Sequence, residues 1–397
     1  MKRRSEFDLM DRSMPHPMTR RARRAITTMA AVAAIATTLA GCSAAGEAAP
    51  GSTADGTAAA EIAQPAGYET VPAPGPAIDV STLAGATVYW IPITSQAPVF
   101  SIEQAAATEA FAAAGVKLQL CDGEANPASV AKCTTQAVSA GAAGIIATSI
   151  PPEFAQQSFG AAVTAGVPVL FVNTKDATTP TEWGDLAAAL PANFTVQAKV
   201  NTDLIIADSK KAAHVLVIGV TDSSVTTSVY ESITAQYASD CPDCVVSSVE
   251  VGSTTLSNLS SQVSAALVKD PAISYVQVEF DSFAAPVVQA IRQLNKSSSI
   301  KVVSMLGQLD GMKRIADGSG FADTTYSLAA LGWNEADVML RMMLGVDPAI
   351  DGHKTPIKTY TSANISSADL TEAAWKSGEW SSDDDFRSMY TMLWGAS

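Results

Sequence analysis

The chain has 397 residues, of which 47% are hydrophobic and 16% are charged, and its formal net charge is −14. Eight Lys/Arg and three Asp/Glu in residues 1–41 give that stretch a charge of +5, so the rest of the chain carries −19. An acidic surface repels phosphate backbones and anionic lipid headgroups, which argues against nucleic acid as a partner. No uninterrupted apolar run after position 42 reaches membrane-spanning length, so we expect a body held to a membrane only by its N-terminus.

Residues 1–41 are predicted to be a lipoprotein signal peptide. A basic segment at 20–24 precedes a small, apolar and uncharged run at 25–40, and these are the n-region and h-region of an export signal. The end of the run, Leu39-Ala40-Gly41-Cys42, resembles the bacterial lipobox, in which the cysteine is lipidated and becomes the first residue of the mature protein. The alternative is an ordinary signal peptide with a cysteine nearby by coincidence.

Residues 42–84 are predicted to be a flexible linker after the lipidated cysteine. Ala, Gly, Pro, Ser and Thr dominate this stretch, which therefore buries too little apolar surface to offset the entropy of ordering it. A flexible coil of this length spans roughly 35 Å on average. We expect it to hold the folded body away from the membrane.

From Gly85 onward, predicted strands and helices alternate. The first series has strands at 87–93, 116–120, 144–150 and 167–172, with helices at 101–114, 127–140 and 153–165. Each of these helices is followed directly by a glycine (Gly115, Gly141 and Gly166), which takes the left-handed conformation that ends a helix without strain. Such alternation predicts a parallel sheet with right-handed crossovers.

A second series follows position 191. Its strands are predicted at 214–220, 245–251, 273–280 and 301–306 with a short extended piece at 324–327, and its helices at 201–211, 225–237, 256–268, 283–294, 309–316 and 331–344. Two similar series, in roughly 310 residues of foldable chain, suit two lobes better than one core. We therefore expect two lobes with a cleft between them.

The five cysteines divide into one lipidation candidate, Cys42, and two close pairs. The pairs are Cys121 with Cys133 and Cys241 with Cys244. In an exported protein, an even remainder of cysteines indicates structural disulfides. A Cys-x-x-Cys pair is alternatively redox-active, free or half of a metal site, but no second such pair and no nearby histidine supports zinc.

Several motifs occur in a characteristic order along the two series. They are Ala97-Pro98-Val99-Phe100 before the first helix, Ala-Gly-Val-Pro-Val at 165–169, Asp281 before a helix, the stretch 309–318 after a strand, and Thr324-Thr325 leading to Gly332. In order and spacing they resemble the type I periplasmic-binding-protein family, in particular the ribose-binding-like sugar receptors of ABC importers. The resemblance extends from about residue 85 to about residue 365.

The resemblance implies an α/β fold of two doubly wound parallel-sheet lobes, joined by three crossovers with a ligand cleft between them. Lobe 1 would comprise 85–195 plus 328–354, and lobe 2 would comprise 196–327 plus 355–365. The crossovers would fall near 190–195, 326–329 and 354–357. The remaining tail, 366–397, contains three tryptophans, and we expect it to pack on the body.

The resemblance also places ligand-binding residues at strand ends that face the cleft. The candidates are Thr94, Gln96, Phe100, Asn173, Asp222, Asp281, Gln308 and Tyr326. Thr and Gln both donate and accept hydrogen bonds, as a polyol requires, and Phe100 suits stacking on a sugar face. Alternatively, Phe100 packs within lobe 1, and Asp222 and Asp281 cap helices. The charged clamp typical of ring-sugar binders is largely missing, since Leu306 stands where the family carries Asp.

The implied function is that of a lipid-anchored, extracytoplasmic solute-binding protein of an ABC importer. It would capture a small molecule, preferably a sugar or sugar-like compound, by lobe closure, and act as a monomer with an ABC permease as partner and no cofactor or metal. The alternative is a ligand-sensing lipoprotein that reports to a membrane signalling partner. An enzyme is not expected, because the mature chain has only His214 and His353 and no motif for a nucleophile, phosphate loop or paired-histidine metal site.

Overall fold

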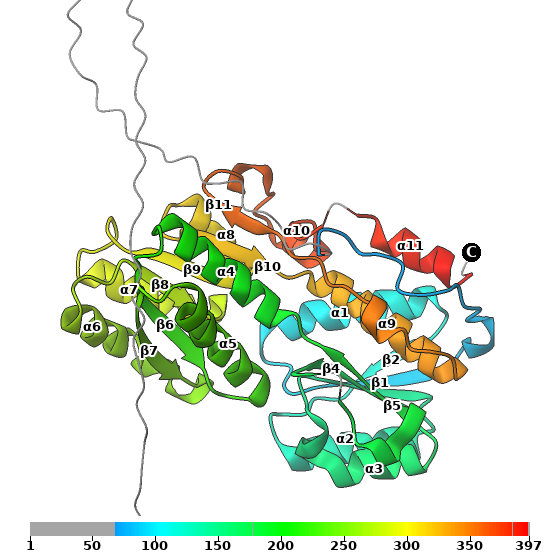
Figure 1. Cartoon of the computed structure of the whole chain (residues 1–397). Helices are drawn as coiled ribbons and strands as arrows, with labels where there is room; N and C mark the ends of the chain where they lie inside the picture. Colours follow the sequence, from blue (N-terminus) through cyan, green and yellow to red (C-terminus); the bar gives the residue numbers. More distant parts are fainter. Residues whose placement is uncertain (1–67, 177, 383, 396–397) are drawn as a thin grey trace, which may run out of the picture. The chain divides into compact units, whose positions relative to one another are not determined.

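The computed structural model describes residues 68–395 except positions 177 and 383. The predicted signal peptide, Cys42 and the first part of the predicted linker lie outside these residues. Within the described part of the chain, no helix combines the length and apolar character needed to cross a membrane. The described residues form two α/β lobes, each built on its own sheet (Figure 1).

The sheet of lobe 1 has five parallel strands among the described residues, in the spatial order β2-β1-β3-β4-β5. They are β1 (Thr87–Pro92), β2 (Lys117–Leu120), β3 (Gly144–Thr148), β4 (Val169–Thr174) and β5 (Ala187–Pro191). Helices α1 (Pro98–Ala113) and α9 (Leu328–Leu344) cover one face, and α2 (Pro127–Ser139) and α3 (Gln156–Thr164) cover the other (Figure 1). Because both faces are covered, β3 and β4 are buried along their whole length.

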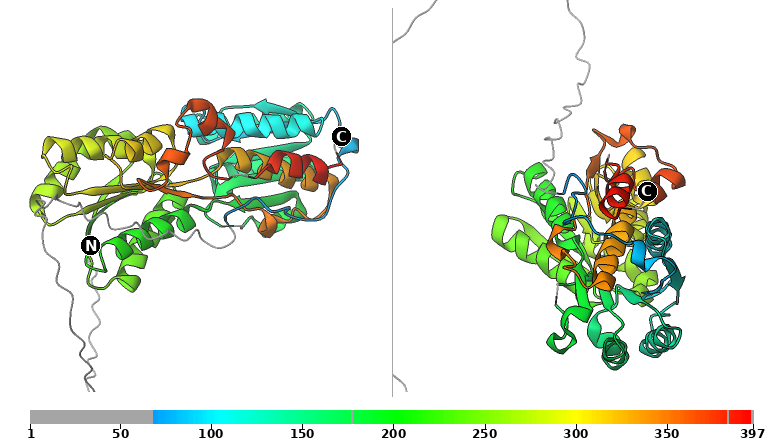
Figure 2. Two further views of the ribbon diagram at one scale, coloured as in Figure 1. Left: turned by 90° about the horizontal axis from the view of Figure 1, so that it is seen from above. Right: turned by 90° about the vertical axis from the view of Figure 1, so that its right-hand side faces the viewer.

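The sheet of lobe 2 has the spatial order β11-β10-β9-β8-β6-β7 in the described chain. Its strands are β6 (His214–Val220), β7 (Val245–Val251), β8 (Tyr275–Val278), β9 (Lys301–Leu306), β10 (Ala322–Thr325) and β11 (Thr359–Thr361). Helices α4 (Phe194–Asp208) and α5 (Ser224–Asp240) lie on one face, and α6 (Leu259–Lys269), α7 (Ala284–Gln293) and α8 (Leu309–Ala316) lie on the other (Figure 2). The edge strand β11 runs antiparallel to β10.

Three connections in the described chain join the lobes: β5 to α4, β10 to α9, and α9 to β11. Helix α9 follows lobe 2 in the sequence but packs against α1 of lobe 1. It is buried without interruption from Leu328 to Met342. The predicted fold class, two doubly wound parallel-sheet lobes joined by three crossovers, is confirmed.

The glycines predicted to end three helices of lobe 1 have the expected backbone. Gly115, Gly141 and Gly166 have φ values of +71°, +71° and +81°. L-residues rarely adopt this left-handed conformation, whereas glycine adopts it without a steric penalty. The helix ends of lobe 1 are therefore set by local sequence.

Some elements differ from the sequence prediction. Strand β5 was not predicted, because its sequence Ala-Ala-Ala-Leu-Pro has little intrinsic strand propensity and forms a strand by pairing with β4. Helix α4 begins at Phe194, seven residues before the predicted start at 201, and it directly follows the first connection between the lobes. Strand β11 was also not predicted, and its three residues form a strand by pairing with β10.

The linker prediction is wrong for residues 68–84, which pack on the folded body. Val71 and Val80 are buried at 7% and 4% exposure. The N–H of Ile78 donates to Leu393 O at 2.9 Å, and the carbonyl of Pro76 accepts from Arg341 Nη2 at 2.9 Å. The average composition of 42–84 is dominated by small and polar residues, so it did not reveal the few apolar side chains that become buried. Hydrogen bonds between backbone groups and distant residues cannot be predicted from composition.

The C-terminal tail contacts both lobes. Near its middle, Trp380 packs with Met312 and Ile315 of α8 in lobe 2, close to helix α10 (Glu372–Ser377). Near its end, Trp394 stacks on Trp333 of α9, with ring centroids 5.4 Å apart and planes 7° from parallel. Helix α11 (Phe386–Leu393) accordingly lies along α9 (Figure 2). The tail thus connects the outer surfaces of the two lobes.

Two disulfides lie within the described residues. Cys121 and Cys133 are bonded with their Cα atoms 5.8 Å apart, and they join the end of β2 to α2. Cys241 and Cys244 are bonded with their Cα atoms 5.3 Å apart, in the turn between α5 and β7. Each disulfide therefore closes a local loop within one lobe.

Candidate functional site

A hollow of about 220 Å³ lies where strand ends of the two sheets face each other. From lobe 1 it is lined by Ala97, Pro98, Val99, Phe100, Glu103, Ser149, Asn173 and Leu328. From lobe 2 it is lined by Phe280, Ser282, Leu306 and Gln308, with Phe194 contributed by the connection between the lobes. Ligands of open parallel sheets bind beyond the carboxyl ends of the strands, so this hollow is the candidate ligand site.

Aromatic rings from both lobes form the apolar wall of the hollow. The ring centroid of Phe194 lies 5.6 Å from that of Phe280, in an edge-to-face arrangement, and 5.3 Å from that of Tyr326. Because Phe194 is the first residue of α4, it stands beside the chain segment that joins the lobes. The aromatic contacts therefore connect lobe 2 with the first and second connections between the lobes.

Glu103 supplies a carboxyl group on the lobe 1 side of the hollow. Its side chain is 1% exposed, and its Oε1 accepts a hydrogen bond from Thr148 Oγ1 at 2.6 Å. Burial raises the pKa of Glu103 to about 7, although the bond from Thr148 acts in the opposite direction. Near neutral pH the group therefore exists in both its charged and its neutral form.

A second buried carboxyl group, Glu335 on α9, lies close enough to Glu103 for their charges to interact. It accepts a hydrogen bond from Trp90 Nε1 at 3.2 Å. Burial, reinforced by the charge on Glu103, raises the pKa of Glu335 well above its ordinary value. Burial therefore disfavours the charged form of both carboxyl groups, and the charge of either one disfavours ionisation of the other.

Asp281 and Asp323 organise the loop after β9 on the lobe 2 side. Asp281 accepts the backbone N–H of Gln308 at 2.8 Å and the hydroxyl of Ser304 at 2.5 Å, and Asp323 accepts the N–H of Gly307 at 3.1 Å. Burial raises the pKa of Asp281, and burial together with the charge of Asp281 raises that of Asp323. These bonds fix the loop that brings Leu306, with φ of +100°, and Gln308 to the hollow.

Three of the predicted ligand-binding residues line the hollow: Phe100, Asn173 and Gln308. Tyr326 is buried directly behind them, with its hydroxyl 3.5 Å from Asn173 Oδ1. Asp281 is also buried, and its carboxylate is engaged beneath the loop. The sequence therefore pointed to strand ends that surround this hollow, although two of these five residues support the lining and do not form part of it.

The other predicted residues do not line this hollow in the described structure. Asp222 is exposed before α5, and the neighbouring Ser223 caps that helix by accepting the N–H of Thr226. Gln96 is exposed, and its N–H donates to Thr94 Oγ1 at 3.2 Å within the loop after β1. In these loops the side chains of Thr94 and Ser223 satisfy a local turn and a helix cap, which is the competing role for polar residues at strand ends.

Sequence reasoning missed Glu103, Phe194, Phe280 and Leu306. One signal was present: Glu103 lies three residues after Phe100, so the two share a helix face. Phe280 adjoins the predicted Asp281, but it was interpreted as the end of a buried strand. No local pattern distinguishes a strand-end phenylalanine that faces a cleft from one that faces a core.

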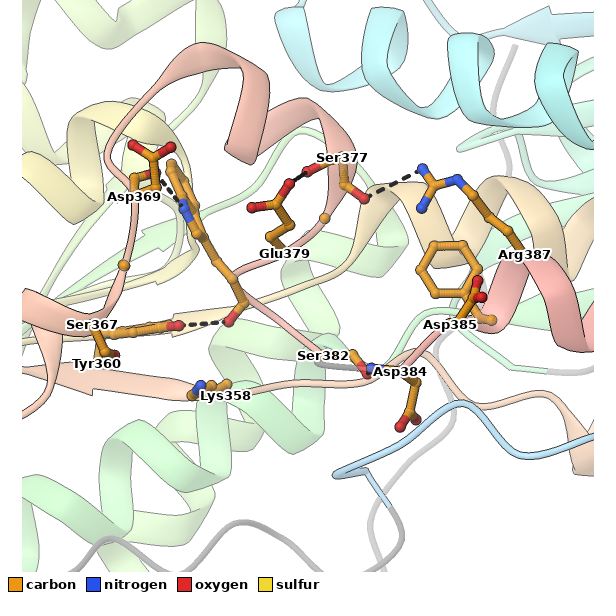
Figure 3. A pocket seen from close by; sticks show the side chains of 14 residues that line it. Lys358, Tyr360, Ser367, Asp369, Ser377, Glu379, Ser382, Asp384, Asp385 and Arg387 are labelled. Atoms are coloured by element: carbon orange, nitrogen blue, oxygen red, sulfur yellow. Dashed lines mark hydrogen bonds between the residues drawn. The ribbon is translucent and has the colours of Figure 1, made fainter.

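A second hollow, of about 500 Å³, lies between β11 and the C-terminal tail (Figure 3). Its polar groups bond largely to one another: Tyr360 donates to Trp380 O at 2.9 Å, and Trp380 Nε1 donates to Asp369 O at 2.9 Å. Arg387 donates to Ser377 O at 3.3 Å. The hollow is thus part of the tail's own hydrogen-bonded structure, and it lies away from the paired strand ends. In the described residues no group of three or more His, Cys, Asp or Glu is arranged to hold a metal ion.

Two open parallel sheets with a ligand-sized hollow between their strand ends define a two-lobed binding protein. A family model described as periplasmic binding protein domain matches residues 88–345. The chain belongs to this family, as the sequence resemblance predicted. No curated protein matches the sequence.

Solved structures share the fold at low sequence identity. The periplasmic ribose ABC transporter protein of Conexibacter woesei has a TM-score of 0.64 at 16% identity, covering 77% of this chain and 99% of that one. A Mycobacterium smegmatis protein in complex with β-D-fucofuranose has a TM-score of 0.62 at 16% identity, covering 75% and 98%. An Agrobacterium vitis solute-binding protein bound to α-D-tagatopyranose has a TM-score of 0.62 at 16% identity, covering 70% and 96%. At this low identity, the structural similarity establishes a common fold and nothing further.

Proposed function

We propose that this chain is a lipid-anchored, extracytoplasmic solute-binding protein of an ABC importer, which captures one small molecule, sugar or sugar-like, by lobe closure. The observation that carries the proposal is the hollow between the strand ends of the two lobes, in a chain of the periplasmic binding protein family. Closure about the three connections buries a ligand from both sides, and a ligand that contacts both lobes stabilises the closed state. A permease that recognises the closed form then receives the ligand.

Several solved relatives of the same fold support a sugar-like ligand. The structures from Mycobacterium smegmatis and Agrobacterium vitis contain bound sugars, and the one from Conexibacter woesei is described as a ribose transporter. The hollow of this chain, at about 220 Å³, accommodates one compact molecule. A receptor role also accords with a site that lacks a recognisable nucleophile–base arrangement, so we infer that the protein is not an enzyme.

Ligand binding is tested by a thermal-shift screen of the purified protein against sugars, polyols, nucleosides and amino acids. A ligand at 100 times its dissociation constant adds about 2.7 kcal/mol to the free energy of unfolding. We expect one chemical class to raise the melting temperature, and Phe194→Ala to reduce the shift because it removes one ring of the aromatic wall. Absence of any shift across the screen would refute the receptor role.

The lipid anchor is tested by replacing Cys42. We expect Cys42→Ala to move the protein from the membrane fraction to the soluble extracytoplasmic fraction, because stable retention depends on acyl chains on that cysteine. Ser43→Ala is the matched control and should remain with the membrane. If Cys42→Ala stays in the membrane fraction, another segment holds the protein there and the lipobox interpretation is wrong.

A further inference from the structure

The charge of the hollow differs from what an anionic ligand requires. Among the described residues that line it, Glu103 is the only ionisable side chain, and no Lys, Arg or His is present. The charge of Glu103 raises the pKa of two buried groups, Glu335 on α9 and the hydroxyl of Tyr326, and neither is a cation. A ligand carboxylate or phosphate would therefore meet a carboxyl group without a compensating positive charge.

Glu103 also retains hydrogen-bonding capacity. Its Oε1 accepts from Thr148, and no further hydrogen bond to the side chain occurs among the described residues. A carboxylate offers about four acceptor positions. The remaining capacity faces a lining in which eight of thirteen residues are apolar, so water solvates the group poorly once the lobes close.

Three phenylalanine rings complete the environment of the carboxyl group. Phe100 is on the same helix as Glu103, and Phe194 and Phe280 pack edge to face across the hollow. The face of an aromatic ring attracts cations, most strongly where water is excluded. A lining whose one ionisable group is an acid and which includes three aromatic rings is suited to a cation that also has an apolar surface.

We propose that the cleft selects a compact amine, whose ammonium group pairs with Glu103 and whose apolar face lies against Phe100, Phe194 and Phe280. The inference rests on the proposed function, since it names the ligand of the same cleft. The shared chemistry is the ammonium group, whether it is carried by an amino sugar or by a hydrocarbon ring. Anionic analogues of the same size are rejected.

The experiment compares matched ligands by calorimetry on the purified full chain. One series is glucosamine, glucose and glucuronate, and the other is cyclohexylamine, cyclohexanol and cyclohexanecarboxylate. We expect the amine of at least one series to bind tenfold or more tightly than its hydroxyl analogue, and the acids not to bind. The series that binds identifies the source of the ammonium group. If a neutral or acidic member of a series binds as tightly as its amine or more tightly, the inference is overturned but the proposed function stands. If no solute in this set or in the wider screen binds, both the inference and the proposed function are overturned.

Glu103→Gln tests the residue itself, because glutamine keeps the size and the acceptor for Thr148 but removes the charge. We expect amine affinity to fall at least tenfold while the affinity of any neutral analogue is unchanged. Glu182→Gln is the control, because it removes the same charge at an exposed position outside the hollow. The ligand-free melting temperature of each variant establishes that it folds. Unchanged amine binding by Glu103→Gln would overturn the inference.

The pH dependence supplies an independent readout. An ammonium group stabilises the ionised form of Glu103. At a pH at which Glu103 is protonated in the free protein, the carboxyl group must therefore lose its proton when the amine binds. We expect amine affinity to fall about tenfold per pH unit below the pKa of Glu103 and to level off above it. Affinity that does not vary between pH 5 and pH 8 would contradict the pairing.

Discussion

Trp394 donates its indole N–H to Asp337 Oδ1 at 2.6 Å, and this bond fastens the C-terminal tail to helix α9. Asp337 is fully buried, and its Oδ2 accepts from Arg341 Nε at 2.6 Å and from His353 Nε2 at 2.9 Å. Although burial raises the pKa of Asp337, the hydrogen bonds from His353, Arg341 and Trp394 together hold it below its ordinary value. One carboxylate thus connects α9, the segment after it and the end of the tail.

We expect Trp394→Phe to destabilise the protein by about 1–3 kcal/mol, because Asp337 Oδ1 would be left buried without its donor. The free energy of unfolding from urea titration measures the effect. Met392→Ala is the control in the same segment, since that side chain is 74% exposed. A loss for Trp394→Phe no larger than that of the control would mean that the bond contributes little.

The pH dependence of stability should reveal Glu103. An acid whose pKa is higher in the folded state than in the unfolded state stabilises the fold least when it is ionised. The contribution of Glu103 to the free energy of unfolding is therefore greatest below its ordinary pKa of 4.5 and declines as the pH rises to about 7. The shift corresponds to about 3 kcal/mol at 1.36 kcal/mol per pH unit.

Glu103→Gln removes that ionisation. We expect the variant to gain stability relative to the parent protein between pH 5 and pH 8, by about 3 kcal/mol at the upper end. Denaturant titrations across this range measure the difference. Curves that stay parallel over the whole range would show that Glu103 ionises in the folded state as easily as it does in the unfolded chain.

Gly311 on α8 is expected to tolerate no side chain. A Cβ atom there would lie 2.2 Å from Asp323 Oδ2 and 2.5 Å from Asp281 Oδ1, both buried. In an exposed helix Gly→Ala is stabilising, but here the steric conflict should cost about 1–3 kcal/mol. The free energy of unfolding of Gly311→Ala is the measurement, with the exposed Lys313→Ala on the same helix as control. A stabilised Gly311→Ala would disprove the close approach.

The two disulfides should differ in their contribution to stability. The bond between Cys121 and Cys133 closes a loop with a sequence separation of 12, and that between Cys241 and Cys244 one with a separation of 3. From loop-closure entropy, replacing the first pair by alanine should cost about 3 kcal/mol and replacing the second about 2 kcal/mol. Thermal unfolding of the two double variants compares them. A larger loss for the second pair would contradict the entropic account.

Much of the fold was predictable from local sequence. Short apolar runs alternated with helices that end in glycine, and Gly115, Gly141 and Gly166 have the left-handed backbone that this pattern requires. Strand β5 escaped prediction because its alanines become a strand only through the partner β4. Residues 68–84 escaped for the same reason, since their bonds to Leu393 and Arg341 link positions far apart in the chain.

The candidate site was predictable only in part. Of the strand-end residues that the sequence suggested, Phe100, Asn173 and Gln308 line the hollow. Which strand-end side chain points into a cleft depends on the relative placement of two sheets, and no single segment encodes this. Glu103 was missed because one acidic residue in an amphipathic helix ordinarily faces solvent, and its burial results from packing of α9 on α1.

The position of α9 has a consequence for the order in which the protein can assemble during synthesis. Lobe 1 begins first, but one face of its sheet stays uncovered until residues 328–344 emerge, after β6 to β10 of lobe 2. Five of the six described strands of lobe 2 are available before lobe 1 can be completed. A nascent chain that ends near residue 327 would therefore expose the apolar surface of β1 and α1, and such a surface makes a partly folded chain prone to aggregate.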